Sequence, residues 1–395
     1  MTAFASTGLA LNVYAPVLSP RAGQLIGTYT DMVDGWSHIT QAVGGYWSAA
    51  FNPKGSKAFL DDWYENGIGR DIRLANAALE TRWEGFVNKL TYRCGAITAT
   101  RGPLLDLGNV VHLTYSTVDT TTTPPTMGIR KRVQATDTAQ AAVSRALFGT
   151  IVKNLSTGGA TETNAAIIAN AYIADHAMPE TSVTGGEAGA ASAGEASIQV
   201  ECLGYVHYLT TYIYNNTTSP AVQQYPHTKI AAILTAYALV NAIFGAFSYT
   251  ANTAWQESGW ENDDNDGWTT IKRLVAMGGT SYARWLFGVY TDKIPLYAAA
   301  PTTVEYHQRL AEGGMVTNPT GVPVRPWDVL PGRWIFFPDF LPGRGQPETA
   351  LRDDPRCGFI ESVTFNAPYA MTWQGNRNSS IDQRLARLGL SGIGG

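Results

Sequence analysis

The sequence predicts a β-rich α+β protein, and two kinds of pattern lead to this fold class. Short stretches of alternating polar and apolar residues recur at close intervals up to about residue 135 and return near the end of the chain. Between them lie segments whose apolar residues have helical spacing. A βαβ crossover fold needs apolar parallel strands and glycine-rich strand-to-helix turns, and the sequence shows neither.

Residues 1–135 are expected to form a small barrel or sandwich. Alternation from Tyr46 to Phe51 would place Trp47, Ala49 and Phe51 on one face of a strand. Further strands are expected over residues 71–74, 81–92, 96–100 and 110–116, with a loop at 120–125. Short strands at such intervals, separated by turn residues, are typical of barrels and sandwiches.

One helix is expected inside this β-rich region, over residues 57–66. Ser56 is a favourable N-cap residue, because its hydroxyl can accept a hydrogen bond from a free amide of the first turn. Gly67 is a favourable residue just past the last turn.

The next block is expected to be helical. Asp137 or Thr138 can cap a helix whose stripe is dominated by small apolar residues and runs from Ala139 to Ile151. Gly158-Gly159 would end this helix. A second helix is expected over residues 164–177, and residues 181–197, rich in Gly, Ala, Ser and Glu, are expected to be a flexible loop.

Strand character returns at residues 198–203 and 206–214 and is followed by two helices and a hairpin. The first helix carries its apolar stripe at Ile230, Ile233, Leu234 and Tyr237, and the second, starting at Asp266, carries it at Trp268, Ile271, Leu274 and Val275. The hairpin is expected over residues 284–299, with its turn near Thr291-Asp292-Lys293.

The last part of the chain contains a Pro- and Gly-rich segment, residues 317–347. It carries the aromatic residues Trp327, Trp334, Phe336 and Phe337, so we expect a packed loop. Strands are expected at residues 356–366 and 370–374, before a terminal helix capped by Ser379 or Ser380.

Composition excludes several functional classes. The net charge is −4, and the single dense basic cluster is Arg130-Lys131-Arg132, so a surface that binds nucleic acid stably is not expected. Charged residues make up 15% of the chain and aromatic residues 11%, a balance that favours surfaces covered by neighbouring subunits. A β-rich secreted protein fits this composition equally well.

Cysteine content and hydropathy indicate folding in a reducing cytosol. Cys94, Cys202 and Cys357 are far apart and form no zinc or disulfide pattern. We expect no signal peptide and no stable membrane insertion, because the longest apolar stretch, residues 230–247, is amphipathic.

The acidic run from Glu261 to Gly267 is the sharpest candidate for a metal site. Asn262, Asp264 and Asp266 occupy the first, third and fifth positions of a calcium loop, but the position of its bidentate glutamate is Arg273. Trp268 also opens a helix where the loop should continue. We therefore expect no metal site, and interpret the run as an acidic helix N-terminus.

No residues are expected to be catalytic or to bind a cofactor, and we expect no enzyme. Asp61, Asp62 and Glu65 lie on one short helix, whereas glycosidase carboxylates oppose each other across the sugar. The Gly35-Trp36-Ser37-His38 stretch lacks the closing glycine of a nucleophile elbow. The six histidines form no HxH or HExxH grouping, and no phosphate-binding glycine motif occurs.

Three runs in the first third of the chain resemble a known family. They are Gly44-Gly45-Tyr46-Trp47-Ser48-Ala49-Ala50-Phe51, Trp83-Glu84-Gly85-Phe86-Val87 and Arg101-Gly102-Pro103-Leu104. Their glycine–aromatic punctuation resembles the first barrel domain of tail hub proteins, which lie at the tail tip or baseplate of long-tailed bacteriophages. Matching C-terminal runs are Val324–Val329 and Asp353–Val363.

The resemblance implies two barrel domains similar to tail-tube subunits, with helical and α/β insertions. The expected division is 1–135 for the first barrel, 136–197 for a helical segment and flexible loop, 198–214 plus 301–376 for the second barrel, 215–300 for an inserted α-plus-hairpin domain, and 377–395 for a C-terminal helix and tail.

The function implied by the resemblance is structural: a virion protein, made in the host cytoplasm, that forms a hub ring at the tail tip. Expected partners are two further copies in a homotrimer, the tail tube, distal tail or baseplate proteins, and tail fibre or spike proteins, with DNA only in transit through the lumen. One alternative is the distal tail ring protein, with six copies in place of three. Another is a carbohydrate-binding or hydrolytic β-protein with exposed tryptophans as sugar platforms. For packing in assembly, Trp47, Trp63, Trp83, Trp327 and Trp334 are the candidate residues.

Overall fold

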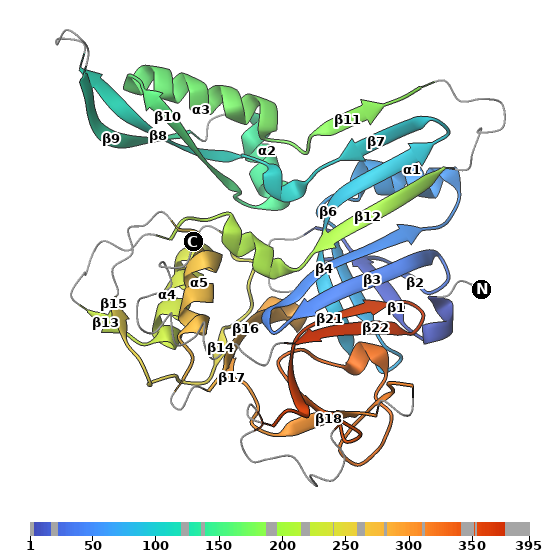
Figure 1. Cartoon of the computed structure of the whole chain (residues 1–395). Helices are drawn as coiled ribbons and strands as arrows, with labels where there is room; N and C mark the ends of the chain where they lie inside the picture. The colour runs from blue at the N-terminus through green and yellow to red at the C-terminus, as the bar shows by residue number, and fades with distance from the viewer. Residues whose placement is uncertain are drawn as a thin grey trace.

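The computed structural model shows a β-rich α+β protein (Figure 1). Most of its strands are connected by hydrogen bonds into one branched network of 17 strands. The residues that the structure describes are 4–16, 23–119, 126–135, 139–186, 196–214, 222–239, 241–258, 265–279, 283–309, 313–340, 351 and 354–375.

A sheet from the first quarter of the chain forms the centre of the molecule. Its strands are β1 (Ala10–Tyr14), β2 (Leu25–Tyr29), β3 (Val33–Gln41), β4 (Val43–Pro53), β5 (Asp71–Ala75), β6 (Thr81–Cys94) and β7 (Ile97–Arg101). Helix α1 (Lys57–Asn66) has the predicted bounds, and the Ser56 hydroxyl accepts a hydrogen bond from the Phe59 amide at 3.3 Å.

Two segments distant in the sequence complete this central sheet. β12 (Ser197–Leu203) pairs with both β4 and β6, whereas β21 (Cys357–Asn366) pairs with β3 and carries β22 (Ala370–Gly375) on its other side. The strand order is therefore β22-β21-β3-β4-β12-β6, and β5 and β7 pair with successive halves of β6. Side by side, these strands form the right half of the view in Figure 1.

This pairing differs from the predicted barrels. β12 joins the N-terminal strands, although residues 198–214 were expected to belong to a second barrel with 301–376. The described strand pairings close no ring, so no closed barrel forms among them. Residues 206–210, part of the strand predicted over 206–214, belong to a 3-10 helix (Tyr205–Thr210) that buries Tyr205 and Tyr208. The reason is that apolar residues spaced three apart bury better on a helical turn than on a strand.

The alternation on β4 is shifted by one residue. Ala49 and Phe51 are buried as expected, but an irregularity in the β3–β4 register lets Tyr46 share their face. Trp47, which was expected on this face, instead packs on His207, with ring centroids 4.2 Å apart.

An α/β arm projects from one end of the sheet (Figure 1). It contains β8 (Val110–Asp119), β9 (Thr126–Ala135), β10 (Val152–Gly159), α2 (Ala139–Phe148) and α3 (Glu162–His176), and β11 (Thr181–Thr184) leads from it to an edge pairing with β7. β8 lies between β9 and β10, and α3 covers one face.

Two predictions for the arm were wrong. The first helix ends at Phe148, because Gly149 has a left-handed φ of 79°, and residues 152–159 form a strand parallel to β8. Residues 181–184, expected in the flexible loop, form β11. The proposed caps Asp137 and Thr138 lie outside the described residues.

The inserted unit contains α4 (Pro226–Ala238), α5 (Gly267–Ala276), β13 (Gln223–Gln224), β14 (Ser248–Tyr249), β15 (Glu257–Ser258), β16 (Trp285–Tyr290) and β17 (Ile294–Ala299). The predicted stripes of both helices are buried, and the hairpin turns at residues 291–293 as predicted. β16 also pairs in parallel with β4, which joins this unit to the central sheet.

The C-terminal lobe is more ordered than the predicted loop. It contains β18 (Val304–Gln308), β19 (Val316–Thr317) and β20 (Trp334–Phe336), and β20 pairs with both β18 and β21. The expected terminal helix lies outside the described residues. In the described part of the chain, no helix is long and apolar enough to span a membrane.

Candidate functional site

Alternate residues of the central sheet place polar side chains on one face. On β3, Trp36, His38 and Thr40 are buried, whereas the intervening Ser37 and Ile39 are partly exposed. The same alternation and the strand registers define what we call the polar face: Ser37, Ile39, Gln41, Ser48, Ala50, Lys89, Thr91, Arg93, Thr98, Thr100, Ser182, Thr184, Gln199, Glu201, Ser362, Thr364, Thr372 and Gln374.

Register brings these side chains into rows that cross the sheet. Ser37 on β3 lies opposite Ala50 on β4, which lies opposite Glu201 on β12 and then Lys89 on β6. Because neighbouring strands lie ~4.8 Å apart, such a row continues without interruption across strands that are far apart in the sequence. Rows that begin on β22 reach β12 through β21, β3 and β4, and rows that begin on β11 reach β12 through β7 and β6, so the two parts of the face meet at β12.

A shallow groove runs along the middle of the polar face. Its volume is about 330 Å³, and its lining includes Ser37, Ser48, Gln199 and Thr364. The Lys89 ammonium lies 3.5 Å from the Glu201 carboxylate, so these two charges compensate each other. The groove therefore presents mainly hydroxyl and amide groups, and the charge of Glu201 in its lining is compensated by Lys89 beside it.

The opposite side of the same strands is part of the hydrophobic core. Trp36 donates a hydrogen bond from Nε1 to Nδ1 of His38 at 3.0 Å, and the His38 ring packs 5.3 Å from that of Phe365. Burial lowers the pKa of His38 to about 3, so the imidazole is neutral at physiological pH. Ser37 and His38 point to opposite faces of β3 and cannot act as a nucleophile and its base.

The three carboxylates on α1 do not face one another across a cleft. Asp61 receives hydrogen bonds from Lys57 at 2.6 Å and from the Tyr92 hydroxyl at 3.0 Å, and the Lys57 contact is the main cause of its lowered pKa. Burial acts to raise the pKa of Asp62, but the hydrogen bonds from Arg70, at 2.9 Å, and from Asn66, together with the charge of Arg70, outweigh it, and the pKa is lowered. Both groups are therefore held as paired carboxylates on the helix surface.

The calcium-like run can be followed only at its end, because residues 261–264 lie outside the described part of the chain. Asp266 is the N-cap residue of α5, and its carboxylate accepts a hydrogen bond from the Thr269 amide at 2.6 Å. Among the described residues, no group of three or more His, Cys, Asp or Glu side chains is arranged to hold a metal ion.

A buried polar cluster that no sequence motif indicates joins the inserted unit to the central sheet. The Lys293 ammonium, at the tip of the β16–β17 hairpin, lies 2.8 Å from Asp71 on β5, and both side chains are almost completely buried. Asp71 also accepts a hydrogen bond from the Tyr205 hydroxyl. We call Asp71, Tyr205 and Lys293 the hairpin lock.

A second set of contacts extends the hairpin lock. The Asp292 amide donates a hydrogen bond to Glu84 at 2.8 Å, and the guanidinium of Arg73 lies 3.3 Å from Glu84 and 2.9 Å from Asp292. Burial raises the pKa of Glu84 to about 7, and the charge of Arg73 only partly offsets this effect. Burial also raises the pKa of Asp71. A signal in the sequence was the charged Asp292-Lys293 pair at a hairpin turn, but its partners lie more than 200 positions away.

The candidate packing tryptophans lie mostly inside the chain. Trp63 and Trp83 are core residues, and Trp327 packs edge-on against Phe365 with ring centroids 5.7 Å apart. Trp334 packs against Phe359 and donates a hydrogen bond to the Pro301 carbonyl at 3.0 Å. Trp327 and Trp334 are at most 7% exposed, so their packing is accounted for within one copy of the chain.

Comparison with known proteins does not show which family the chain belongs to. No protein-family model matches the chain, and no curated protein matches it in sequence. Among solved structures, it is similar to the crystal structure of the 43 kDa tail protein of prophage MuSo2 from Shewanella oneidensis. That similarity has a TM-score of 0.43 and 7% sequence identity, and covers 94% of this chain and 97% of the other.

Proposed function

We propose that this protein is a structural component of a phage tail tip, a hub ring whose polar face lines the channel through which DNA passes. The observation that carries the proposal is the polar face itself. Its hydroxyl and amide side chains extend over neighbouring strands, and the Lys89–Glu201 pair is internally compensated.

The physical argument concerns what a DNA channel must avoid. Lysine and arginine side chains neutralise phosphates and release counterions, which makes nucleic acid adhere. On the polar face, hydroxyl and amide side chains far outnumber the charged residues Lys89, Arg93 and Glu201, and they keep a layer of water between the protein and the phosphates. The net charge of −4 adds a weak repulsion, so DNA can pass without being retained.

The proposal includes three copies in a ring and contacts with tail-tube, distal tail or baseplate and fibre or spike proteins. The resemblance of the Gly44–Phe51 and Trp83–Val87 runs to tail hub proteins supports this part. Six copies are the alternative, for a distal tail ring, and the mass of the assembly separates three 42.6 kDa chains from six.

The carbohydrate-binding alternative has weaker support. A sugar platform needs an exposed indole ring, and in the described part of the chain Trp255, at 38%, is the most exposed tryptophan. A monomer that binds glycans would favour this alternative.

The test of the channel is to make the polar face basic. Phage particles that carry Ser48→Arg together with Thr364→Arg should assemble normally but release their DNA more slowly, because the added guanidinium groups hold phosphates. Ala58→Arg, which adds the same kind of charge on the exposed surface of α1, is the control. Unchanged release rates in the double variant would contradict a channel position for this face.

A further inference from the structure

The turn between β5 and β6 presents an apolar tip to solvent. Ala77, Ala78 and Leu79 are all exposed, and Leu79 is 82% exposed. Leu79 also has a φ of 62°, in the left-handed region that branched apolar residues rarely adopt. Asparagine or glycine would suit this position better, so a strained and exposed leucine points to a function.

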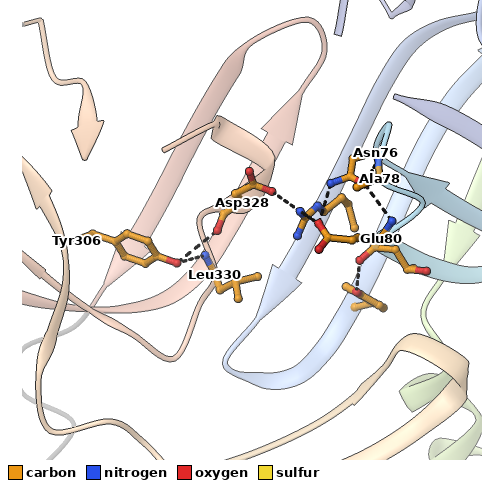
Figure 2. Close-up of polar contacts among 9 residues, drawn as sticks. Asn76, Ala78, Glu80, Tyr306, Asp328 and Leu330 are labelled. Atoms are coloured by element: carbon orange, nitrogen blue, oxygen red, sulfur yellow. Dashed lines mark hydrogen bonds and ion pairs between the residues drawn. The ribbon is translucent and has the colours of Figure 1, made fainter. Parts of the chain in front are cut away.

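The turn is held rigidly on both sides (Figure 2). The Asn76 side-chain oxygen accepts hydrogen bonds from the amides of Ala78 at 3.0 Å and Glu80 at 2.9 Å, and its nitrogen donates to the Glu80 carboxylate at 2.9 Å. The Arg82 guanidinium contacts the Glu80 carboxylate and lies 2.9 Å from that of Asp328, so two carboxylates share one cation and the base of the tip keeps one excess negative charge.

The bracing continues into the C-terminal lobe. The Tyr306 hydroxyl donates to the Asp328 carbonyl at 3.3 Å and accepts from the Leu330 amide at 3.0 Å (Figure 2). The tip is therefore presented in one fixed conformation, and little conformational entropy is lost when it binds a partner.

A cleft of matching character lies at the edge of the polar face, between α5, β16 and β21, and Gln41, Ser362 and Gln374 of the polar face are part of its lining. Its volume is about 490 Å³, and its apolar walls include Val43, Val275, Leu286 and Phe359. Its charged groups are Lys272, Arg284 and Glu361. We call it the α5 cleft.

The charges of the α5 cleft favour an acidic partner. The Arg284 guanidinium stacks on the Phe359 ring at 4.1 Å and lies 3.6 Å from Glu361, so these two charges offset each other. Lys272 is exposed and adds a positive charge at the rim. Its ammonium lies over the Trp268 ring, 5.6 Å from the ring centroid. The cleft thus combines an apolar wall with one excess positive charge.

We propose that the Leu79 tip of one copy inserts into the α5 cleft of the next copy. Leu79 fills the apolar part of the cleft, and the Glu80 carboxylate lies toward Lys272. Leu79 is 82% exposed and so does not occupy the cleft of its own chain. Because tip and cleft are different surfaces, the contact is head-to-tail, the type that generates a closed ring when the rotation permits. This inference rests on the ring in the proposed function and identifies one of its contacts.

The first test compares two leucine-to-asparagine substitutions by sedimentation velocity over a range of protein concentrations. Leu79→Asn relieves the left-handed strain, so folding is preserved, but removes the apolar tip. The association constant should fall about tenfold to a hundredfold, as expected for loss of one buried leucine side chain. Leu25→Asn, at a leucine that is 50% exposed on β2, should associate within about twofold of wild type.

The second test addresses the charge pairing through a double-mutant cycle. Glu80→Lys and Lys272→Glu should each weaken association, and the double variant should associate at least about threefold more tightly than the two single effects together predict. Absence of this coupling, or wild-type association of Leu79→Asn, would overturn the contact while leaving the ring itself intact. A wild-type chain that stays monomeric at every concentration would overturn both the contact and the hub ring.

Discussion

The hairpin lock allows a quantitative prediction about what holds the inserted unit to the central sheet. In Lys293→Met, the buried Asp71 carboxylate loses the ammonium group that lies 2.8 Å from it. Lys293 is 0% exposed and Asp71 5%, so water cannot replace the lost cation. Removing one partner of such a buried pair costs about 3–5 kcal/mol, and we expect a loss of this size in the free energy of unfolding.

The assay is urea denaturation followed by tryptophan fluorescence. The control is Lys89→Met, which breaks the Lys89–Glu201 pair at 33% and 42% exposure and should cost at most about 1 kcal/mol. The double variant Asp71→Leu with Lys293→Met should recover much of the loss, because apolar residues of similar volume often replace a buried ion pair without cost. A Lys293→Met protein within 1 kcal/mol of wild type, about the size of the control effect, would show that the Asp71 carboxylate does not depend on the Lys293 ammonium in the folded chain.

Three further predictions concern pH, packing and capping. The folded-state pKa of Glu84 is raised from 4.5 to about 7, so the native state retains a proton that the unfolded chain has lost, and stability falls as pH rises through this window. Glu84→Gln should flatten that part of the stability–pH profile, and an unchanged slope would contradict the assignment. Trp327→Ala should lower the free energy of unfolding of the isolated chain by about 3–5 kcal/mol, because the indole is buried within one copy. An unchanged free energy of unfolding together with a loss of assembly would instead place the indole at an interface between copies. Asp266→Ala should lower stability by about 1 kcal/mol through loss of the α5 N-cap, equally with calcium and with chelator, whereas a calcium-dependent melting temperature abolished by this substitution would indicate a metal site.

Local patterns located the α-helices of the described residues and strands such as β4, β5, β6, β21 and β22, but not β1, β2 or β3. Capping residues and apolar stripes gave the full span of α1 and the start of α5, because these signals depend on neighbours within a few positions. Residues 152–159 were mispredicted because Ile151 continues the apolar stripe of α2, although Gly149 had already ended the helix.

Long-range pairing was the part that local patterns could not supply. The sequence shows the alternation of β12 and β21, but not that one pairs with β4 and the other with β3. The polar face was therefore visible only as separate runs of alternating residues. The Asp71–Lys293 pair spans 222 positions, and neither residue lies in a recognisable motif.

An electron cryomicroscopy reconstruction of the purified assembly would show directly which face of the sheet lines the channel. We predict a ring of three copies in which β3, β4 and β12 face the central channel and Ser37, Ser48 and Thr364 lie on its wall. A monomer, or a ring in which these strands face outward or are buried against another chain, would contradict the proposal that the polar face is the path of the DNA.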